Sequence, residues 1–336
     1  MTRVRIPTGA FYKMENQENK EKIQETKKEE SQTTDKNITH KKTFGHFHDK
    51  YYKFLLLIPI SFLIFSFIYI SIFYSNHNDF FRKDISLTGG TSATIYGEFN
   101  VNDLKQELSG KLEDVNVREI YDIVTKEQKA VIIETKTSGE ETKKVLENYL
   151  GYELNDNNSS FEFSGSALSQ SFYRQLLLAI FFAFVLMAIV VFILFRTFIP
   201  SSAVIISAFA DILMTLVSVN LLGIRVSNAG IVAFLMLIGY SVDTDILLTN
   251  RVLKRSGEDS LNKRIFGAFK TGMTMTVAAL VAVVSALIVV KSFSAVLSQI
   301  FTIISIGLVF DIFNTWVTNV SILKWYLERK QKEKRE

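Results

Sequence analysis

The sequence predicts a membrane protein, mainly α-helical, with six transmembrane helices and one external α+β ferredoxin-like domain between the first and second helices. Three observations lead to this fold class. Six apolar runs are each long enough to cross a bilayer. The segment after the first run is polar and alternates between strand-like and helix-like patterns. Hydrophobic residues make up 48% of 336 residues, and they are too concentrated in long runs for one soluble core.

Residues 1–50 are predicted to form a disordered cytoplasmic tail. They mix charged and amide side chains and offer almost no apolar surface to bury. They also lack the short apolar segment and the small-residue cleavage site of a signal peptide. We therefore expect no cleavage here.

Residues 54–74 form the first predicted span, because about twenty apolar residues cross a hydrocarbon core of roughly 30 Å. A five-helix transmembrane bundle is predicted over residues 176–323. Its apolar runs are Leu176–Phe195, Ile199–Leu222, Ala229–Thr249, Gly272–Val290 and Val296–Leu323. The last run is the longest, so we expect it to tilt or to end among the lipid head groups. Residues 324–336 are predicted to be a basic cytoplasmic tail.

The distribution of basic residues predicts that both termini lie in the cytoplasm of a cell-membrane protein. The connection at Arg196, the segment 250–270 and the C-terminal tail are basic and fall on the N-terminal side of the membrane. The opposite connections, near 223 and 291, carry one basic residue each. The segment 75–175 is then external, and it holds 17 Asp and Glu against 11 Lys and Arg.

The external segment 75–175 contains its own folding pattern. Strands are expected at 92–98, 117–124, 129–135 and 160–164, with helices at 102–112 and 139–150. The order strand, helix, strand, strand, helix, strand is that of a four-stranded antiparallel sheet backed by two helices. This pattern predicts the ferredoxin-like domain.

Aspartates inside the apolar runs are the strongest candidates for function. Asp211 lies near the middle of the third span, where a charged residue costs about 2.5–3.5 kcal/mol to insert. Ser207, Thr215 and Ser218 share its helix face. Asp311 lies in the last span and has its own polar neighbours, which are Asn314, Thr315, Thr318 and Asn319. Two spans therefore present polar seams, for which hydrogen-bonded helix packing is the alternative explanation.

The fourth span carries Asp243 and Asp245 in its cytoplasmic half. Residues two apart on a helix point about 200° apart, so the two carboxyls cannot face the same groove. One faces the bundle while the other meets a neighbouring subunit or the head groups. We favour Asp243 and Asp211 as proton or ion relay residues, and we leave Asp311 open between relay and packing. Asp245 and the nearest cation, Lys270, are interpreted as interfacial groups.

Other kinds of site find no support in the sequence. There is no cysteine, phosphate loop or nucleophile elbow, and the four histidines lie outside the spans. We therefore expect no enzymatic activity, cofactor or metal, and the small, unevenly spread net charge of +4 argues against a nucleic-acid partner. Gly89 and Gly90 are interpreted as a loop that passes close to another backbone.

Five segments together resemble the SecD/SecF family of protein-export membrane proteins, in its archaeal SecF form. They are ISLTGGT at 85–91, the span that carries Asp211, GYSVDTDILLTNRV at 239–252, FKTGMTMT at 269–276 and FDIFNTWVTN at 310–319. The resemblance implies one half of an RND-type assembly that pairs with a SecD-like subunit. It also implies a SecYE-type translocation channel and a secreted polypeptide as partners, the lipid bilayer as surroundings, and use of the proton gradient.

The resemblance also implies site residues. It points to Asp243 as the proton-binding carboxylate, and it makes Gly89, Gly90, Gly239 and Tyr240 structural motif residues. In the bacterial pattern GYSV is followed by Asn, Asp and Thr, so the carboxylate here is displaced by one position. A bacterial arginine corresponds to Lys270.

Two other functions remain open at this point. The chain could be a non-transporting scaffold in which the aspartates hold two subunits together, and substitutions would then weaken co-purification. It could also be an RND-type exporter of small molecules or lipids. A single six-helix half with one compact external domain argues against the exporter.

Overall fold

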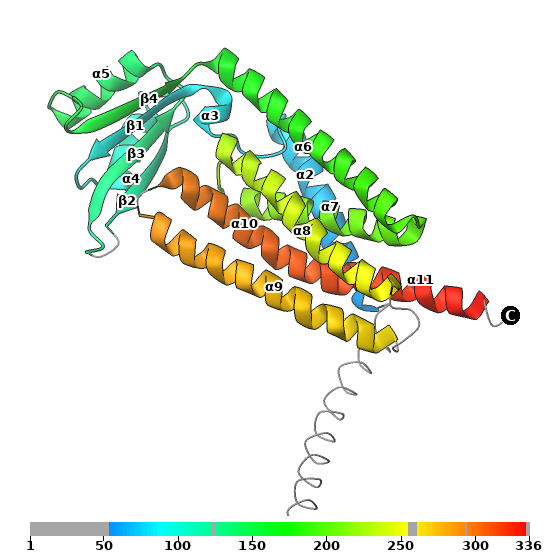
Figure 1. Ribbon diagram of the computed structural model, residues 1–336. Helices are drawn as coiled ribbons and strands as arrows, with labels where there is room; N and C mark the ends of the chain where they lie inside the picture. The colour runs from blue at the N-terminus through cyan, green and yellow to red at the C-terminus, as the bar shows by residue number, and fades with distance from the viewer. Residues whose placement is uncertain (1–53, 123–124, 255–260, 293, 334–336) are drawn as a thin grey trace, which may run out of the picture. The chain divides into compact units, whose positions relative to one another are not determined.

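The computed structural model describes residues 54–122, 125–254, 261–292 and 294–333. In these residues the chain is mainly helical, with one small antiparallel sheet (Figure 1). The predicted tail over residues 1–50 lies outside the described residues.

Six helices in the described part are long and apolar enough to cross a membrane, which matches the six predicted spans. They are α2 (Leu57–His77), α6 (Ser166–Phe195), α7 (Phe198–Leu221), α8 (Asn228–Lys254), α9 (Leu261–Val290) and a last helical stretch that contains α10 (Ala295–Phe313). Both α6 and α9 begin well before their apolar runs. An apolar run marks only the part of a helix that suits hydrocarbon, and backbone hydrogen bonding continues into the polar turns beyond it.

The last span is not one uninterrupted α-helix. After α10 the backbone forms a π-helical segment, η1 (Asn314–Asn319), and then continues as α11 (Val320–Glu333). The predicted basic tail is therefore helical as far as Glu333. Helices α10 and α8 pack closely at Gly307, where an added Cβ would lie only 2.4 Å from Cδ1 of Leu237.

The segment between α2 and α6 folds as the predicted order of strands and helices. Its elements are β1 (Gly90–Tyr96), α4 (Val101–Ser109), β2 (Asn116–Tyr121), β3 (Gln128–Thr135), α5 (Gly139–Leu150) and β4 (Ser159–Ser164). The strands are antiparallel in the order β2-β3-β1-β4. Alternate residues such as Ile95 and Ile133 pack against Leu104, Leu108 and Leu146 of the two helices. We call this unit the sheet domain.

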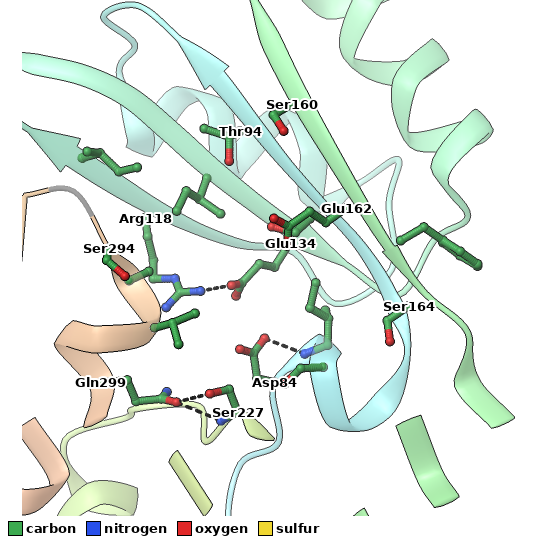
Figure 2. A pocket seen from close by; sticks show the side chains of 18 of the residues that line it. Asp84, Thr94, Arg118, Glu134, Ser160, Glu162, Ser164, Ser227, Ser294 and Gln299 are labelled. Carbon is green, nitrogen blue, oxygen red and sulfur yellow. Dashed lines mark hydrogen bonds and ion pairs between the residues drawn. The ribbon is translucent and has the colours of Figure 1, made fainter. Parts of the chain in front are cut away.

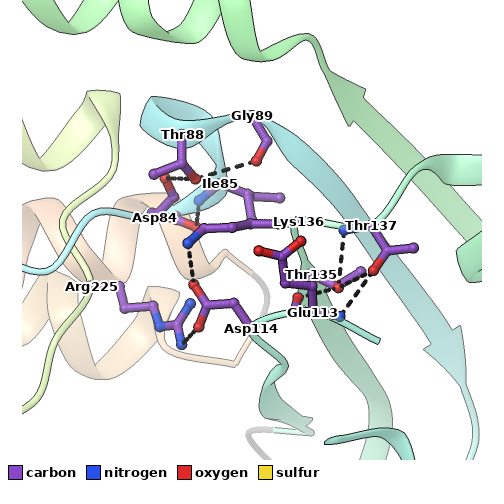
Figure 3. A network of polar contacts seen from close by, with 10 residues as sticks. All are labelled: Asp84, Ile85, Thr88, Gly89, Glu113, Asp114, Thr135, Lys136, Thr137 and Arg225. Carbon is purple, nitrogen blue, oxygen red and sulfur yellow. Dashed lines mark hydrogen bonds and ion pairs between the residues drawn. The ribbon is translucent and has the colours of Figure 1, made fainter. Parts of the chain in front are cut away.

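A one-turn helix, α3 (Ile85–Thr88), leads from α2 into the sheet domain (Figure 3). Asp84 caps it, since one carboxylate oxygen accepts a hydrogen bond of 2.5 Å from the amide of Ile85. Gly89 ends α3 with φ at 84°, and a Cβ on it would lie 2.4 Å from Cα of Ser166 in α6. A Cβ on Gly90 would lie 2.2 Å from the carbonyl oxygen of Thr135. Each glycine thus makes a close backbone approach of the kind that the sequence predicts.

Side chains also tie the sheet domain to the bundle (Figure 3). Arg225, in the connection before α8, donates a hydrogen bond of 2.8 Å to Asp114, and Lys136 lies 3.1 Å from the other carboxylate oxygen. Burial opposes ionisation of Asp114, but the hydrogen bonds and charges of Arg225 and Lys136 outweigh it and lower its pKa. The connection before α8 is thereby fixed to the sheet domain.

Candidate functional site

Three aspartates from three different helices lie inside the bundle. Asp211 comes from α7, Asp245 from α8 and Asp311 from α10, and their exposed fractions are 0%, 0% and 1%. All three were candidates from the sequence. Apolar helices bring them into the interior because each carboxyl lies on the polar seam of its helix, and that seam packs against the other helices.

Asp211 is held by two donors. Ser241 of α8 donates a hydrogen bond of 2.5 Å to its Oδ2, and Asn314 of η1 donates one of 2.6 Å to its Oδ1. A carboxyl that joins three helices in this way fixes their mutual rotation. The polar seam predicted for the third span therefore faces protein.

Asp245 and Asp311 share a donor. The hydroxyl of Thr315 lies 2.9 Å from Oδ1 of Asp245 and 3.3 Å from Oδ1 of Asp311. Asn319 donates a second hydrogen bond of 2.8 Å to Asp245, and Thr244 donates one of 2.9 Å to Asp311. The second carboxylate oxygen of each aspartate is buried without a hydrogen-bond partner. Asp245 and Asp311 each thus keep one buried oxygen that accepts no hydrogen bond.

The charge of this cluster is not balanced within the described residues. No Lys or Arg there forms an ion pair with Asp211, Asp245 or Asp311. Three ionised carboxylates in a bundle interior would repel one another and would lose hydration worth several kcal/mol each. Such a cluster is stable when protons or a cation neutralise part of it. The described residues contain no group of three or more His, Cys, Asp or Glu placed to hold a metal ion.

The π-helical segment η1 supplies most of the donors. Asn314, Thr315, Thr318 and Asn319 are all buried there, and a π turn changes the helical phase relative to a regular α-helix. Thr318 in turn donates a hydrogen bond of 3.1 Å to Asn314. Segments of this kind occur often at functional sites. The sequence pattern predicts the polar residues of η1, but it contains no signal for the π geometry.

The two aspartates of α8 differ in burial, and the difference is the reverse of the expectation for Asp245. Asp243, which the sequence favoured, is exposed, while Asp245, interpreted there as interfacial, is completely buried. The physical reason is the 200° between them, which lets only one face the cluster. Lys270 is also exposed and does not join the cluster. Gly239 and Tyr240 lie on the same exposed face of α8 as Asp243.

Known proteins resemble this chain over most of its length. Residues 143–329 match the family described as "Protein export membrane protein SecD/SecF, C-terminal". The protein-export membrane protein SecF of Methanocaldococcus jannaschii is 38% identical over 85% of this chain and 99% of its own. SecF of Methanothermobacter thermautotrophicus is 48% identical over 51% of this chain and 60% of its own. The names of these relatives describe protein export rather than an enzyme.

A solved structure shares the fold. The crystal structure of SecDF, a translocon-associated membrane protein from Thermus thermophilus, superimposes with a TM-score of 0.66 at 18% sequence identity. The match covers 82% of this chain but only 38% of the SecDF chain. The chain thus corresponds to well under half of that longer protein.

Proposed function

Because this chain belongs to the SecD/SecF family of protein-export membrane proteins, we propose that it is a SecF-like subunit that pairs with a SecD-like subunit and uses the proton gradient to assist polypeptide translocation. The observation that supports gradient use is the cluster of Asp211, Asp245 and Asp311, buried without a cationic partner in the described residues. A proton that enters or leaves this cluster changes the balance between donors and acceptors around Thr315. We assign the main relay role to Asp245.

The energy available is sufficient for a conformational change. Moving one elementary charge through 100 mV is worth about 2.3 kcal/mol. Two conformations of a protein commonly differ by a few kcal/mol, so protonation of one carboxyl can shift their populations. When Asp245 is ionised it needs the Thr315 hydroxyl, and when it is protonated it can release that hydroxyl to Asp311. This exchange would let α8 and η1 adopt two arrangements.

The same helices lead to the sheet domain. The amide of Asp84 donates a hydrogen bond of 3.0 Å to the carbonyl oxygen of Val226, just before α8 begins. Gln299 of α10 accepts hydrogen bonds from the amide and the hydroxyl of Ser227. At about 1.5 Å per residue, Asp245 lies roughly 27 Å along α8 from Ser227. A shift of α8 against α10 at the cluster would therefore be transmitted to the junction with the sheet domain.

The proposed setting is a cell membrane with both termini in the cytoplasm and the sheet domain, ferredoxin-like in topology, outside. The basic connections support this orientation. The exposed face of α8 that carries Gly239, Tyr240 and Asp243 is the proposed contact with the SecD-like subunit, because a carboxyl on a spanning helix is costly against lipid. A SecYE-type channel and a secreted polypeptide complete the proposed assembly.

The test is export into membrane vesicles prepared from cells that lack this chain and its SecD-like partner. Restoring both subunits should increase the protected fraction of a secretory polypeptide, and a protonophore should abolish that increase. An increase that persists with the protonophore would favour the scaffold. No increase would rule out the export role.

A further inference from the structure

A cleft of about 590 Å³ lies between the sheet domain and the adjacent ends of the bundle helices (Figure 2). One wall is the face of the sheet that α4 and α5 leave uncovered. The other wall comes from α3, the residue before α8 and the start of α10. None of the residues proposed to bind protons lies in it.

Hydroxyl and carboxylate side chains line part of the sheet wall, beside apolar residues such as Ile120 and Ile132. Ser92 and Thr94 of β1 alternate with the core residues of that strand, and Ser160 and Glu162 of β4 lie beside them in register. Thr94 pairs with Ser160, and Ser92 pairs with Glu162. Two adjacent strands thus present rows of hydrogen-bonding groups to the cleft.

Asp84 forms the floor of the opposite wall (Figure 2). Asp84 is only 7% exposed, and one of its carboxylate oxygens accepts a hydrogen bond from the amide of Ile85. The other oxygen makes no hydrogen bond with the part of the chain that the structure describes. Burial raises the pKa of Asp84, against the lowering influence of the Arg118 and Arg225 charges and the Ile85 hydrogen bond. A buried carboxyl with a free oxygen toward a cleft favours a positively charged or donating ligand.

The net charge of the residues that line the cleft also favours a positively charged ligand. Arg118 of β2 is its one basic residue, and its guanidinium is paired with Glu134 of β3. Asn116 donates a further hydrogen bond of 2.8 Å to Glu134. Glu162 forms no ion pair with any residue that the structure describes. Asp84 and Glu162 therefore leave the lining with an excess of two negative charges, and Arg225 is already engaged by Asp114.

We propose that this cleft binds an extended polypeptide segment that carries a basic side chain, with the cationic group of that side chain placed between Asp84 and Glu162. The volume lies within the roughly 300–1,000 Å³ that is usual for ligand sites. An extended backbone can pair its amide and carbonyl groups with the hydroxyl rows of β1 and β4. Anionic ligands such as lipid phosphates are disfavoured by the excess negative charge.

The inference rests on the proposed function only for the source of the polypeptide, which would be a protein in transit. Binding itself requires neither a proton gradient nor a second subunit. The test therefore uses the full chain alone in detergent micelles, with a short fluorescent peptide of alternating Lys and Ser as the probe. A peptide of alternating Glu and Ser is its matched control.

Fluorescence anisotropy should show saturable binding of the Lys peptide and none of the Glu peptide. Asp84→Asn, which keeps the helix cap, should weaken binding about tenfold, as expected for a charge-assisted hydrogen bond. Glu162→Gln should weaken it several-fold. Glu141→Gln, on α5 behind the sheet, should leave it unchanged.

Equal binding of both peptides would overturn the proposal, as would unchanged affinity in both cleft variants. Equal loss in Glu141→Gln would show a nonspecific charge effect and would also contradict it. Because no gradient is used, failure here leaves the export experiment unaffected. If the Lys peptide binds as expected but a proton gradient has no effect on export, only the proposed use of the gradient would be rejected.

Discussion

The hydroxyl of Thr315 lies 2.9 Å from Oδ1 of Asp245, and the same hydroxyl lies 3.3 Å from the nearest oxygen of Asp311. A threonine hydroxyl has one proton to donate, so it can serve only one of the two carboxylates at a time. The other must find a donor elsewhere or carry a proton of its own. This shared donor is the element of the cluster most directly affected by protonation.

Replacing Thr315 by valine removes the shared donor and keeps the shape of the side chain. We expect Thr315→Val to destabilise the protein by about 1–3 kcal/mol, because buried acceptors lose their partner. Thr315→Ser keeps the hydroxyl and should stay within about 1 kcal/mol of wild type. Chemical unfolding in micelles measures both. Equal stability of the valine and serine variants would show that the shared hydroxyl has no energetic role.

Asp84 should make stability depend on pH. Burial raises its folded pKa above the ordinary value of 3.8, so its contribution is fully present below that value and is lost as pH rises through the folded pKa. Asp84→Asn keeps a capping side chain and should flatten this fall, with stability at neutral pH equal to or above wild type. Asp84→Ala should lose about 1 kcal/mol with the cap. Thermal unfolding across a pH series would reveal these differences. If stability depended on pH in Asp84→Asn as it does in wild type, Asp84 would not be the group responsible.

Two of the motif glycines, Gly89 and Gly239, should respond in opposite ways to alanine. Gly89 has φ at 84°, and a backbone atom of Ser166 lies 2.4 Å from its Cβ position, so Gly89→Ala should destabilise the protein by about 1–3 kcal/mol. Gly239 lies in α8 with nothing within 4 Å of its Cβ position. Gly239→Ala should therefore be neutral or stabilise the isolated chain by roughly 0.5–1 kcal/mol. Thermal unfolding of both variants checks this, and a tolerated alanine at Gly89 would be inconsistent with the packing against α6.

The orientation can be tested by labelling, because the chain contains no cysteine. A single cysteine in place of Lys105 on α4 should react with a membrane-impermeant maleimide in intact cells. A cysteine in place of Lys332 on α11 should react only after the membrane is opened. The reverse pattern would place the sheet domain in the cytoplasm and would exclude the orientation proposed here.

The elements that could be predicted from sequence are those set by local pattern. The six apolar runs and the alternating strands specify helices and sheet without reference to distant residues. The polar seams of Asp211 and Asp311 follow from helical spacing alone. The rotation of α8 could not be predicted, since both of its faces carry polar and apolar residues, and packing against α7 and α10 decides whether Asp243 or Asp245 is buried.

Two further features depend on contacts between distant segments. The π geometry of η1 accompanies the packing of its polar side chains against α7 and α8, and no residue type in Asn314–Asn319 signals it. The cleft brings Asp84, Arg118 and Glu162 together from three separate parts of the chain. The pattern of a single sequence contains no information about which distant segments come into contact.

The proposed relay role of Asp245 is tested by comparing the variants Asp245→Asn and Asp243→Asn. Both variants remove one carboxyl from the same helix, but only Asp245 lies in the buried cluster. Export into vesicles is measured with and without a proton gradient, and co-purification of the SecD-like subunit is checked in the same preparations. We expect Asp245→Asn to lose the gradient-stimulated part of export and Asp243→Asn to retain it. Full gradient stimulation in Asp245→Asn would exclude the proposed relay role of Asp245.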